Sequence, residues 1–240
     1  MKHFLLVASV ISCIAFAQAS NGQSLKDKRL ADISTVELTK LISATPLNSP
    51  IHQELLLRAS HSHLMIVAYD QYSVLWQQHP DSADTNLWRG IAAEYLFSDS
   101  MYPELRKTYS KVATDLLLPT ATTCLAKAVK VAPNSPTANR EDGFFLWQYG
   151  NKLPEGLLLL RKALRLAPSD PRTHTIWGNV YANPDGKAYD LKKAIYELRV
   201  ANSLDPSYAF PHELLSNIYA RQNLTVMAMQ EQMKFQQLMP

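Results

Sequence analysis

The stretch LAPSDPRTHTIWGNVY, from Leu166 to Tyr181, decides the fold of this chain, because in it Pro168 is followed ten residues later by Gly178. A single pair of this kind is common at turns and helix ends, but the same pair recurring at a fixed period indicates a repeat architecture. Prolines that align with it stand at Pro46, Pro80, Pro133, Pro168, Pro206 and Pro240. The steps between them are 34, 53, 35, 38 and 34 residues. The period is therefore close to 34 residues, with two insertions.

Small residues keep the same period as the prolines. Ten residues after a proline stand Gly90, Gly143, Gly178 and Ser216, and twelve residues before a proline stand Ser34, Ala68, Ala121, Gly156, Ala194 and Ala228. Ala194, Leu198 and Ala201 are spaced by four and three, which places them on one stripe of a helix. Small side chains let two helices approach closely. Each period therefore predicts a helical hairpin, with Leu56 in place of the small residue in the first one.

The segments between hairpins carry helix stop and start signals. A proline ends the second helix because it lacks an N–H group and clashes with the preceding turn. Asn134-Ser135-Pro136 and Ser169-Asp170-Pro171 then supply an N-cap and a proline at the first helical position. The opening stretch is thus the joint between one repeat and the next.

This pattern resembles the tetratricopeptide repeat (TPR) family, whose helix–turn–helix unit has small residues and a closing proline at these relative places. The resemblance covers roughly residues 31–240 and implies an all-α fold, a right-handed superhelix or α-solenoid. The expected units are about 47–80, 81–133 with an insertion, 134–168, 169–206 and 207–240. The chain departs from the family pattern where an aromatic residue is usual early in the first helix, at His52, Asn86, Asn139, His174 and His212.

The N-terminus has the composition of a targeting segment. A basic start, an apolar run from Phe4 to Phe16 and the small-x-small sequence Ala17-Gln18-Ala19 predict a signal peptide over residues 1–19, followed by a flexible mature N-terminus over 20–30. We therefore expect an exported protein, periplasmic or secreted. A membrane anchor that is retained and a lipoprotein processed at Cys13 are the alternatives, and only lipidation of Cys13 would tether the mature chain to a membrane.

The composition is that of an ordinary globular chain. Hydrophobic residues make up 47% of the 240 residues, the formal net charge is +3, and the chain has no long Lys/Arg run, which argues against a nucleic acid partner. Removal of the signal peptide leaves Cys124 alone, in an apolar helical pattern, so we expect a buried side chain and no disulfide within the chain.

Catalytic motifs are missing from the sequence. It contains no GxSxG, Walker or dinucleotide-binding motif. His61 and His63 are two residues apart and diverge on a helix, so we expect no metal site there. The adjacent pair Glu141-Asp142 is expected to be surface charge. We therefore expect no enzymatic activity and no cofactor.

One rival interpretation places an enzyme site in the inserted segment, residues 97–118. Six polar residues gather there: Tyr102, Glu104, Arg106, Lys107, Tyr109 and Asp115. General acid–base catalysis requires such groups to converge on one pocket, which a sequence does not show. A structural embellishment is the other interpretation of this insertion.

The resemblance implies a binding groove, because the first helix of each hairpin lines the concave face of such a superhelix. The residues expected to project there are Arg140, Phe144 and Trp147 in one repeat, Arg172, Thr175 and Asn179 in the next, and Phe210, Glu213, Asn217 and Arg221 in the last. Asn179 and Asn217 should lie side by side and bind a peptide backbone through their carboxamides. The arginines would add recognition of carboxylates. The alternative is a merely solvated polar face.

The last helix, from Ala228 onward, offers two interpretations. Gln230, Gln232, Gln236 and Gln237 would let it cap the array, whereas Met227, Met229, Met233 and Met239 would form a contact surface for a partner or a second copy. We expect at least half of these methionines to pack in the core. Taken together, the sequence predicts an exported, non-enzymatic protein-interaction scaffold that binds a protein or peptide partner. A homo-oligomerising spacer and an enzyme subunit are the alternatives.

Overall fold

The architecture was derived from a computed structural model, which describes residues 33–99, 111–150 and 152–238. Every regular element in these ranges is helical. The helices are α2 (Thr35–Ala44), α3 (Ile51–His61), α4 (Met65–Gln78), α5 (Ala83–Asp99), the π-helical turn η1 (Ala113–Leu117), α7 (Leu118–Val131), α8 (Pro136–Gln148), α9 (Leu153–Leu166), α10 (Pro171–Ala182), α11 (Leu191–Leu204), α12 (Phe210–Arg221) and α13 (Thr225–Leu238).

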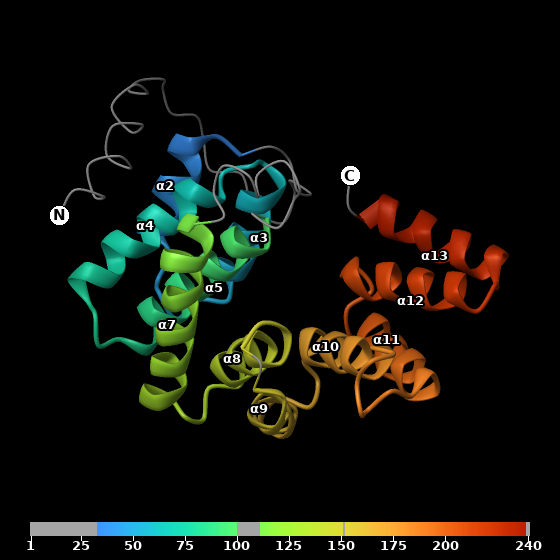
Figure 1. The fold of residues 1–240 in the computed structure, drawn as a ribbon. Coiled ribbons are helices and arrows are strands. Elements are labelled where there is room, and N and C mark those ends of the chain that lie inside the picture. The colour runs from blue at the N-terminus through green and yellow to red at the C-terminus, as the bar shows by residue number, and fades with distance from the viewer. Residues whose placement is uncertain (1–32, 100–110, 151, 239–240) are drawn as a thin grey trace.

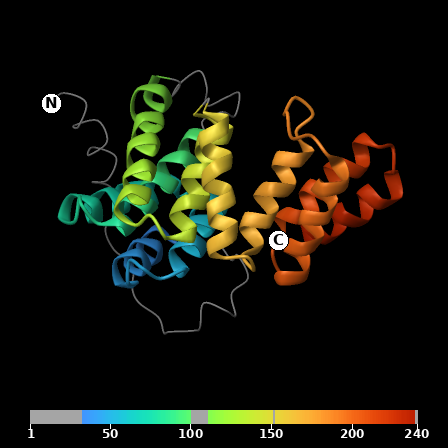
Figure 2. The same cartoon turned by 90° about the horizontal axis from the view of Figure 1, so that it is seen from below.

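Consecutive helices pair as hairpins. The pairs are α5 with α7, α8 with α9, α10 with α11, and α12 with α13, whereas α4 packs against α5 and α2 more extensively than against α3. Figures 1 and 2 show the hairpins following one another from the first helices to α13 at the opposite end. The fold is an all-α solenoid of helix–turn–helix repeats, as the sequence predicted.

The joints between hairpins use the predicted caps. The side chain of Ser135 accepts a hydrogen bond from the backbone N–H of Ala138, and that of Asp170 accepts from Arg172 and Thr173. The second helices stop two residues before the repeat proline, α7 at Val131 and α9 at Leu166. The residue preceding a proline disfavours helical backbone, so the helix ends earlier than the proline itself.

The small repeat positions are points of helix contact, which confirms their predicted role. A Cβ atom on Gly178 would lie 2.5 Å from Cγ of Leu198, and one on Gly143 would lie 3.0 Å from the carbonyl oxygen of Gly156. In the last hairpin, the hydroxyl of Ser216 donates to the carbonyl oxygen of Ala228 at 2.9 Å.

The residues that replace the usual aromatic form a recurring bond. The side chains of His52, Asn86, Asn139 and His174 each hydrogen-bond the carbonyl oxygen of the proline six residues earlier, at distances of 3.1, 2.8, 2.8 and 2.9 Å. This bond holds the proline segment of the joint against the first one and a half turns of the next helix. The sequence showed the substitution but not the bond.

The core differs between the two ends of the chain. One continuous apolar cluster runs from Ile33, beside α2, to Phe145 of α8. Two smaller clusters follow, one joining α9 to α10 and one holding α10 to α13 together. We refer to α2–α8 as the N-terminal half and to α9–α13 as the C-terminal half.

Several sequence-based expectations concern residues outside the described ranges. They are the signal peptide over 1–19 with Cys13, the mature N-terminus over 20–30, Met239, Pro240 and the polar residues of the insertion from Tyr102 to Tyr109. Within the described ranges, none of the helices has the length and apolar character needed to span a membrane.

Candidate partner-binding face

The candidate site is the inner side of α8, α10 and α12, the first helices of the last three hairpins. We call it the C-terminal inner face and define it by Phe144, Trp147, Arg172, Asn179, Phe210, Asn217 and Arg221. Asn179 and Asn217 stand at the same repeat position, eleven residues after Pro168 and Pro206, on two helices that pack against each other. Asn179 is half-buried and Asn217 is exposed, so both carboxamides reach the surface.

Arg140, the first predicted arginine of the groove, lies inside the molecule instead of on its surface. It is 4% exposed. Its Nη2 donates to Oε1 of Glu141 at 2.7 Å, and its Nη1 donates to Oδ2 of Asp170 at 2.7 Å. Gln53 of α3 completes the group: its Oε1 accepts from Nη2 of Arg140 at 3.1 Å, and its Nε2 donates to Glu141 at 3.0 Å. This Arg140 network joins α3, α8 and the start of α10.

Asp170 connects the network to helix capping. Burial by itself would raise the pKa of this carboxyl, but the Arg140 guanidinium and the hydrogen bonds from Thr173 outweigh burial and lower the pKa. Oδ2 of Asp170 accepts from both the backbone N–H and the hydroxyl of Thr173. The N-cap of α10 is therefore held ionised by a residue of α8.

The expectation that Glu141-Asp142 is surface charge was wrong, since both residues are buried. Their side chains do diverge, as adjacent residues on a helix must. Glu141 joins the Arg140 network, whereas Oδ1 of Asp142 is buried and accepts no hydrogen bond from any described residue. Burial raises the pKa of Asp142 to about 6, against the opposing charge of Lys152.

The inner side of α5 is filled. Leu87, Trp88 and Ile91 are buried there, and so is Glu94. Burial, together with the charge of Glu141, raises the pKa of Glu94 well above its usual range. The solvent-accessible part of the inner face therefore begins at α8.

Arg172 and Arg221 differ in how they are held. The guanidinium of Arg172 lies 5.1 Å from the ring centroid of Tyr208, and no carboxylate of a described residue pairs with it. Arg221 donates from Nη1 to the carbonyl oxygen of Ala182 at 3.2 Å, which closes the C-terminal end of α10. Arg172 is thus a cation held in place and open to an anion, whereas Arg221 has a structural bond already.

Aromatic side chains flank these polar groups. The rings of Phe144 and Trp147 lie 5.9 Å apart on α8, and those of Tyr208 and Phe210 lie 5.6 Å apart at the start of α12. Phe144, Trp147 and Phe210 are half-buried. Trp147 also packs against the cluster that joins α9 to α10. Tyr208 was not predicted as a residue of this face, although it stands two residues before the predicted Phe210.

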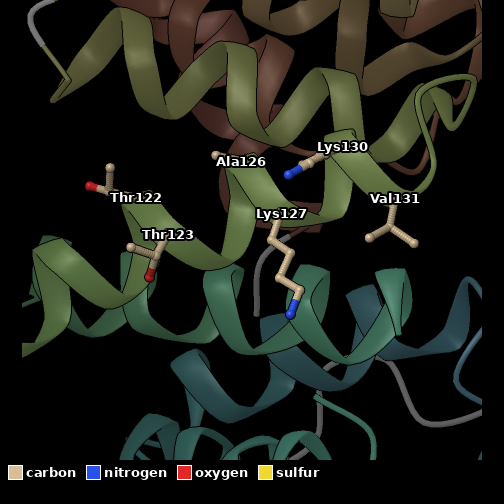
Figure 3. Close-up of a pocket in the computed structure, with 6 residues that line it drawn as sticks. All are labelled: Thr122, Thr123, Ala126, Lys127, Lys130 and Val131. Atoms are coloured by element: carbon tan, nitrogen blue, oxygen red, sulfur yellow. The ribbon is translucent and has the colours of Figure 1, made fainter. Parts of the chain in front are cut away.

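A shallow depression on the other side of the molecule is a weaker candidate. Thr122, Thr123, Ala126, Lys127, Lys130 and Val131, all on one stretch of α7, line it, and Figure 3 shows Lys127 extended toward the neighbouring helices. Lys127 pairs there with Asp81 at 2.7 Å. Surface threonines and lysines of a single helix do not make a built site.

Catalytic and metal chemistry find no support in the described part of the chain. No group of three or more His, Cys, Asp or Glu residues is placed there to hold a metal ion. Of the six polar residues of the insertion, only Asp115 is described, and it is exposed. Cys124 is buried as predicted, and burial raises the pKa of its thiol, which disfavours the reactive thiolate.

Comparisons with known proteins bear on the fold. No family model matches the chain, and no curated protein sequence matches it. Among solved structures, TTC0263, a thermophilic TPR protein of Thermus thermophilus, is similar over 80% of this chain and 89% of its own, with a TM-score of 0.52 and 15% identity. MamA residues 41–end from Desulfovibrio magneticus RS-1 gives 0.47 and 21% identity over 85% and 97% of the two chains. YrrB, described as a TPR protein with an unusual peptide-binding site, gives 0.42 and 15% over 85% and 93%. The similarity to TTC0263 shows a TPR-like fold and nothing further.

Proposed function

We propose that this chain is a non-enzymatic protein-interaction scaffold that binds an extended peptide segment or partner protein along the C-terminal inner face. The observation that carries the proposal is Arg172, which stacks on Tyr208 without a carboxylate partner among the described residues and shares α10 with Asn179, while Asn217 holds the matching position of α12. Fully buried arginines are almost always paired, and Arg172 is half-buried without a carboxylate partner among the described residues. A binding partner would supply it.

The residue types fit recognition of a peptide. Each carboxamide of Asn179 and Asn217 offers one acceptor and two donors, which match the N–H and C=O groups of an extended backbone whatever its side chains. Arg172 adds an anion site, so the expected segment carries an acidic side chain or a C-terminal carboxylate. Phe144 and Phe210 offer apolar contacts on either side. These contacts would order a flexible segment through main-chain bonds and one charged anchor.

Export is part of the proposal and rests on the sequence alone. The basic start, apolar run and small-x-small site of residues 1–19 support secretion to the periplasm or the exterior. A lipoprotein anchored at Cys13 is the alternative. Metabolic labelling with a radioactive fatty acid, together with the mass of the mature N-terminus, distinguishes the two.

In-cell crosslinking of a C-terminally tagged protein, followed by mass spectrometry, tests the proposed face. The variant is Arg172→Ala/Asn179→Ala/Asn217→Ala. Its matched control is Lys130→Ala/Asn134→Ala/Gln236→Ala, which removes the same kinds of groups from exposed positions elsewhere. We expect one dominant partner that is captured by the wild type and the control but lost in the variant, with melting temperatures within about 2 °C of each other. Equal capture by the variant would overturn the assignment.

A homo-oligomer formed through α13 is the second candidate, favoured by one observation. Ala228 is the buried residue of α13, while Met229 and Met233 are 61% and 57% exposed and Val226 is 70% exposed. The expectation that at least half of the methionines pack in the core was wrong for the three described ones. Light scattering of Val226→Gln/Met229→Gln/Met233→Gln beside the wild type tests this surface: a wild-type mass that stays monomeric at all concentrations removes the candidate.

A further inference from the structure

Positive charge is concentrated on three of the second helices of the solenoid. The second helices α7, α9 and α11 carry eight lysines and arginines against two acids, whereas the first helices α8, α10 and α12 carry three of each. The net charge of the whole chain is only +3, so this difference reflects where the charged residues lie and not an excess of cations. It gives the outer side of the solenoid a basic character that the composition conceals.

The exposed part of this surface combines cations with large apolar side chains. Leu158, Arg161 and Arg165 follow one stripe of α9, and Lys192, Tyr196 and Arg199 follow one stripe of α11. We call these six residues the outer basic face. Leu158 and Tyr196 are 61% and 65% exposed and stand at the same repeat position, as do Arg161 and Arg199. Figure 1 shows α9 at the bottom of the C-terminal half and α11 beside α10 in the next hairpin.

The acids of these helices are engaged elsewhere. Glu155 pairs with Lys152, and Glu197 pairs with His174 across the hairpin. Asp190, which caps α11, pairs with Lys193. None of the described carboxylates pairs with Arg161, Arg165 or Lys192. Arg199 donates from Nη2 to the hydroxyl oxygen of Tyr219 at 3.2 Å, whereas the other cations of the outer basic face keep their charge free for an external anion.

We propose that the outer basic face binds the surface of an anionic lipid membrane. Exposed lysines and arginines are attracted to negatively charged headgroups, while an exposed leucine and tyrosine can enter the boundary between headgroups and acyl chains. The geometry fits because two successive repeats present the same pair of side chains outward. Single-stranded nucleic acid is disfavoured, since it requires a groove and aromatic platforms, whereas Leu158 offers no π-face. This inference is independent of the C-terminal inner face.

Vesicle flotation with the full chain tests the proposal. The probes are vesicles of phosphatidylcholine alone and of phosphatidylcholine with about one third phosphatidylglycerol, at low salt and at about 0.5 M NaCl. The apolar stretch of residues 4–16 is present in every variant, so differences between variants report on the outer basic face. Circular dichroism confirms that each variant is folded.

Two variants and one control separate the contributions. The variant Arg161→Gln/Arg165→Gln/Arg199→Gln should lower binding to anionic vesicles roughly hundredfold, because each cation contributes a factor of about tenfold or less to the binding constant. Leu158→Ser/Tyr196→Ser should lower binding further at high salt, where charge is screened. Lys40→Gln/Lys111→Gln/Lys187→Gln removes the same charge from exposed positions elsewhere and should retain most of the binding.

The outcomes are distinct. Loss of anionic-vesicle binding in the arginine variant with retention in the control supports the proposal. It is overturned by a wild type that binds both kinds of vesicle equally, by an arginine variant that binds like the wild type, or by a wild type that binds a single-stranded RNA but no anionic vesicle. Failure here leaves crosslinking at the inner face unaffected, so the two proposals fail separately.

Discussion

The two halves of the solenoid place different residues at the same repeat positions. Eleven residues after the repeat proline, the N-terminal half has the apolar residues Leu57, Ile91 and Phe144, of which Ile91 is buried and the others half-buried, whereas the C-terminal half has half-buried Asn179 and exposed Asn217. The N-terminal half also has one continuous core, while the C-terminal half has two small clusters. The same repeat can therefore serve as a packed platform at one end and as an open surface at the other.

The halves meet through polar contacts as well as apolar ones. Arg140 of α8 binds Gln53 of α3 on one side and Asp170, the cap of α10, on the other. The cluster between α9 and α10 is the smallest of the three. The Arg140 network thus supplies a connection where hydrophobic packing is least extensive.

The strongest test of this connection is Arg140→Met. It leaves Glu141 and Asp170 buried without their cation, so the free energy of unfolding should fall by about 3 to 5 kcal/mol. Urea denaturation measures it, because urea does not screen charges. Arg161→Met, at an exposed position, is the control and should change stability by about 0.5 kcal/mol or less. Equal midpoints for the two variants would contradict the structural role of the network.

Gly178→Leu tests the difference in hairpin packing. Leu56 fills the equivalent position in the first hairpin, but in α10 a Cβ already meets Leu198 at 2.5 Å. We expect a loss of about 3 kcal/mol in thermal or urea unfolding, because the helices must separate. The reciprocal change Leu56→Gly should also destabilise, by leaving a cavity. A Gly178→Leu protein with wild-type stability would show that α10 and α11 tolerate a leucine between them, as the first hairpin does at Leu56.

Asp142→Leu should raise stability instead. Three of the four equivalent positions hold apolar residues, Leu55, Trp177 and Leu215, and the fourth holds Arg89, whereas Asp142 is 4% exposed with a pKa of about 6. Its folded pKa lies above the unfolded value of about 3.9, so the wild type loses stability as the pH rises from the unfolded pKa through the folded one. We expect a gain of about 2 kcal/mol at about pH 8 that shrinks toward about pH 4. A gain that is the same at both pH values would contradict the unpaired-carboxylate explanation.

The smallest effect compares two histidines at one repeat position. The hydrogen bond to Glu197 raises the pKa of His174 despite its burial, so this pair stabilises the fold below about pH 6.5 and loses its effect as the pH rises through the folded pKa. Burial lowers the pKa of His52, so the stability that its neutral, Tyr72-bonded form contributes declines as the pH falls from the unfolded pKa of about 6.5 through the lower folded pKa. Acid thus strengthens one half and weakens the other.

Asparagine is the matched substitution for both histidines. Asn139 stands at the same repeat position and makes the same bond to its proline carbonyl. His174→Asn should cost about 1 kcal/mol more at about pH 5.5 than at about pH 8, and His52→Asn should show the opposite dependence. Urea denaturation at the two pH values measures both. The same pH dependence in both variants would remove the contrast between the halves.

The repeat architecture could be predicted because its signals are local. Pro168, Gly178 and Ala194 mark one unit within the length of a single hairpin, and the structure places them at a joint and a helix contact. The inner face stays a prediction, although Arg140, one of its expected residues, lies inside the molecule. Asn179 and Asn217 stand on packed helices as expected, since their positions follow from the repeat period.

Burial at the inner face could not be predicted, because it depends on distant segments. Glu141 and Asp142 are adjacent acids, a typical surface pattern, and only the contact with Gln53 of α3 shows where Glu141 lies. The departure at His52 and its equivalents was visible, but its purpose required the position of the proline carbonyl. Sequence reasoning thus recovered the period and missed the interactions that cross from one repeat to another.

The contact between Gln53 and Glu141 has a consequence for the order of folding. These residues are 88 positions apart, whereas the bonds that form each joint connect residues six apart. Short-range contacts close first because little chain entropy is lost in bringing their ends together. Hairpins can therefore nucleate and propagate independently, and the long-range contact forms only after three of them have assembled. Its formation marks completion of the N-terminal half, and pulse-labelled hydrogen exchange should find it among the last protections acquired.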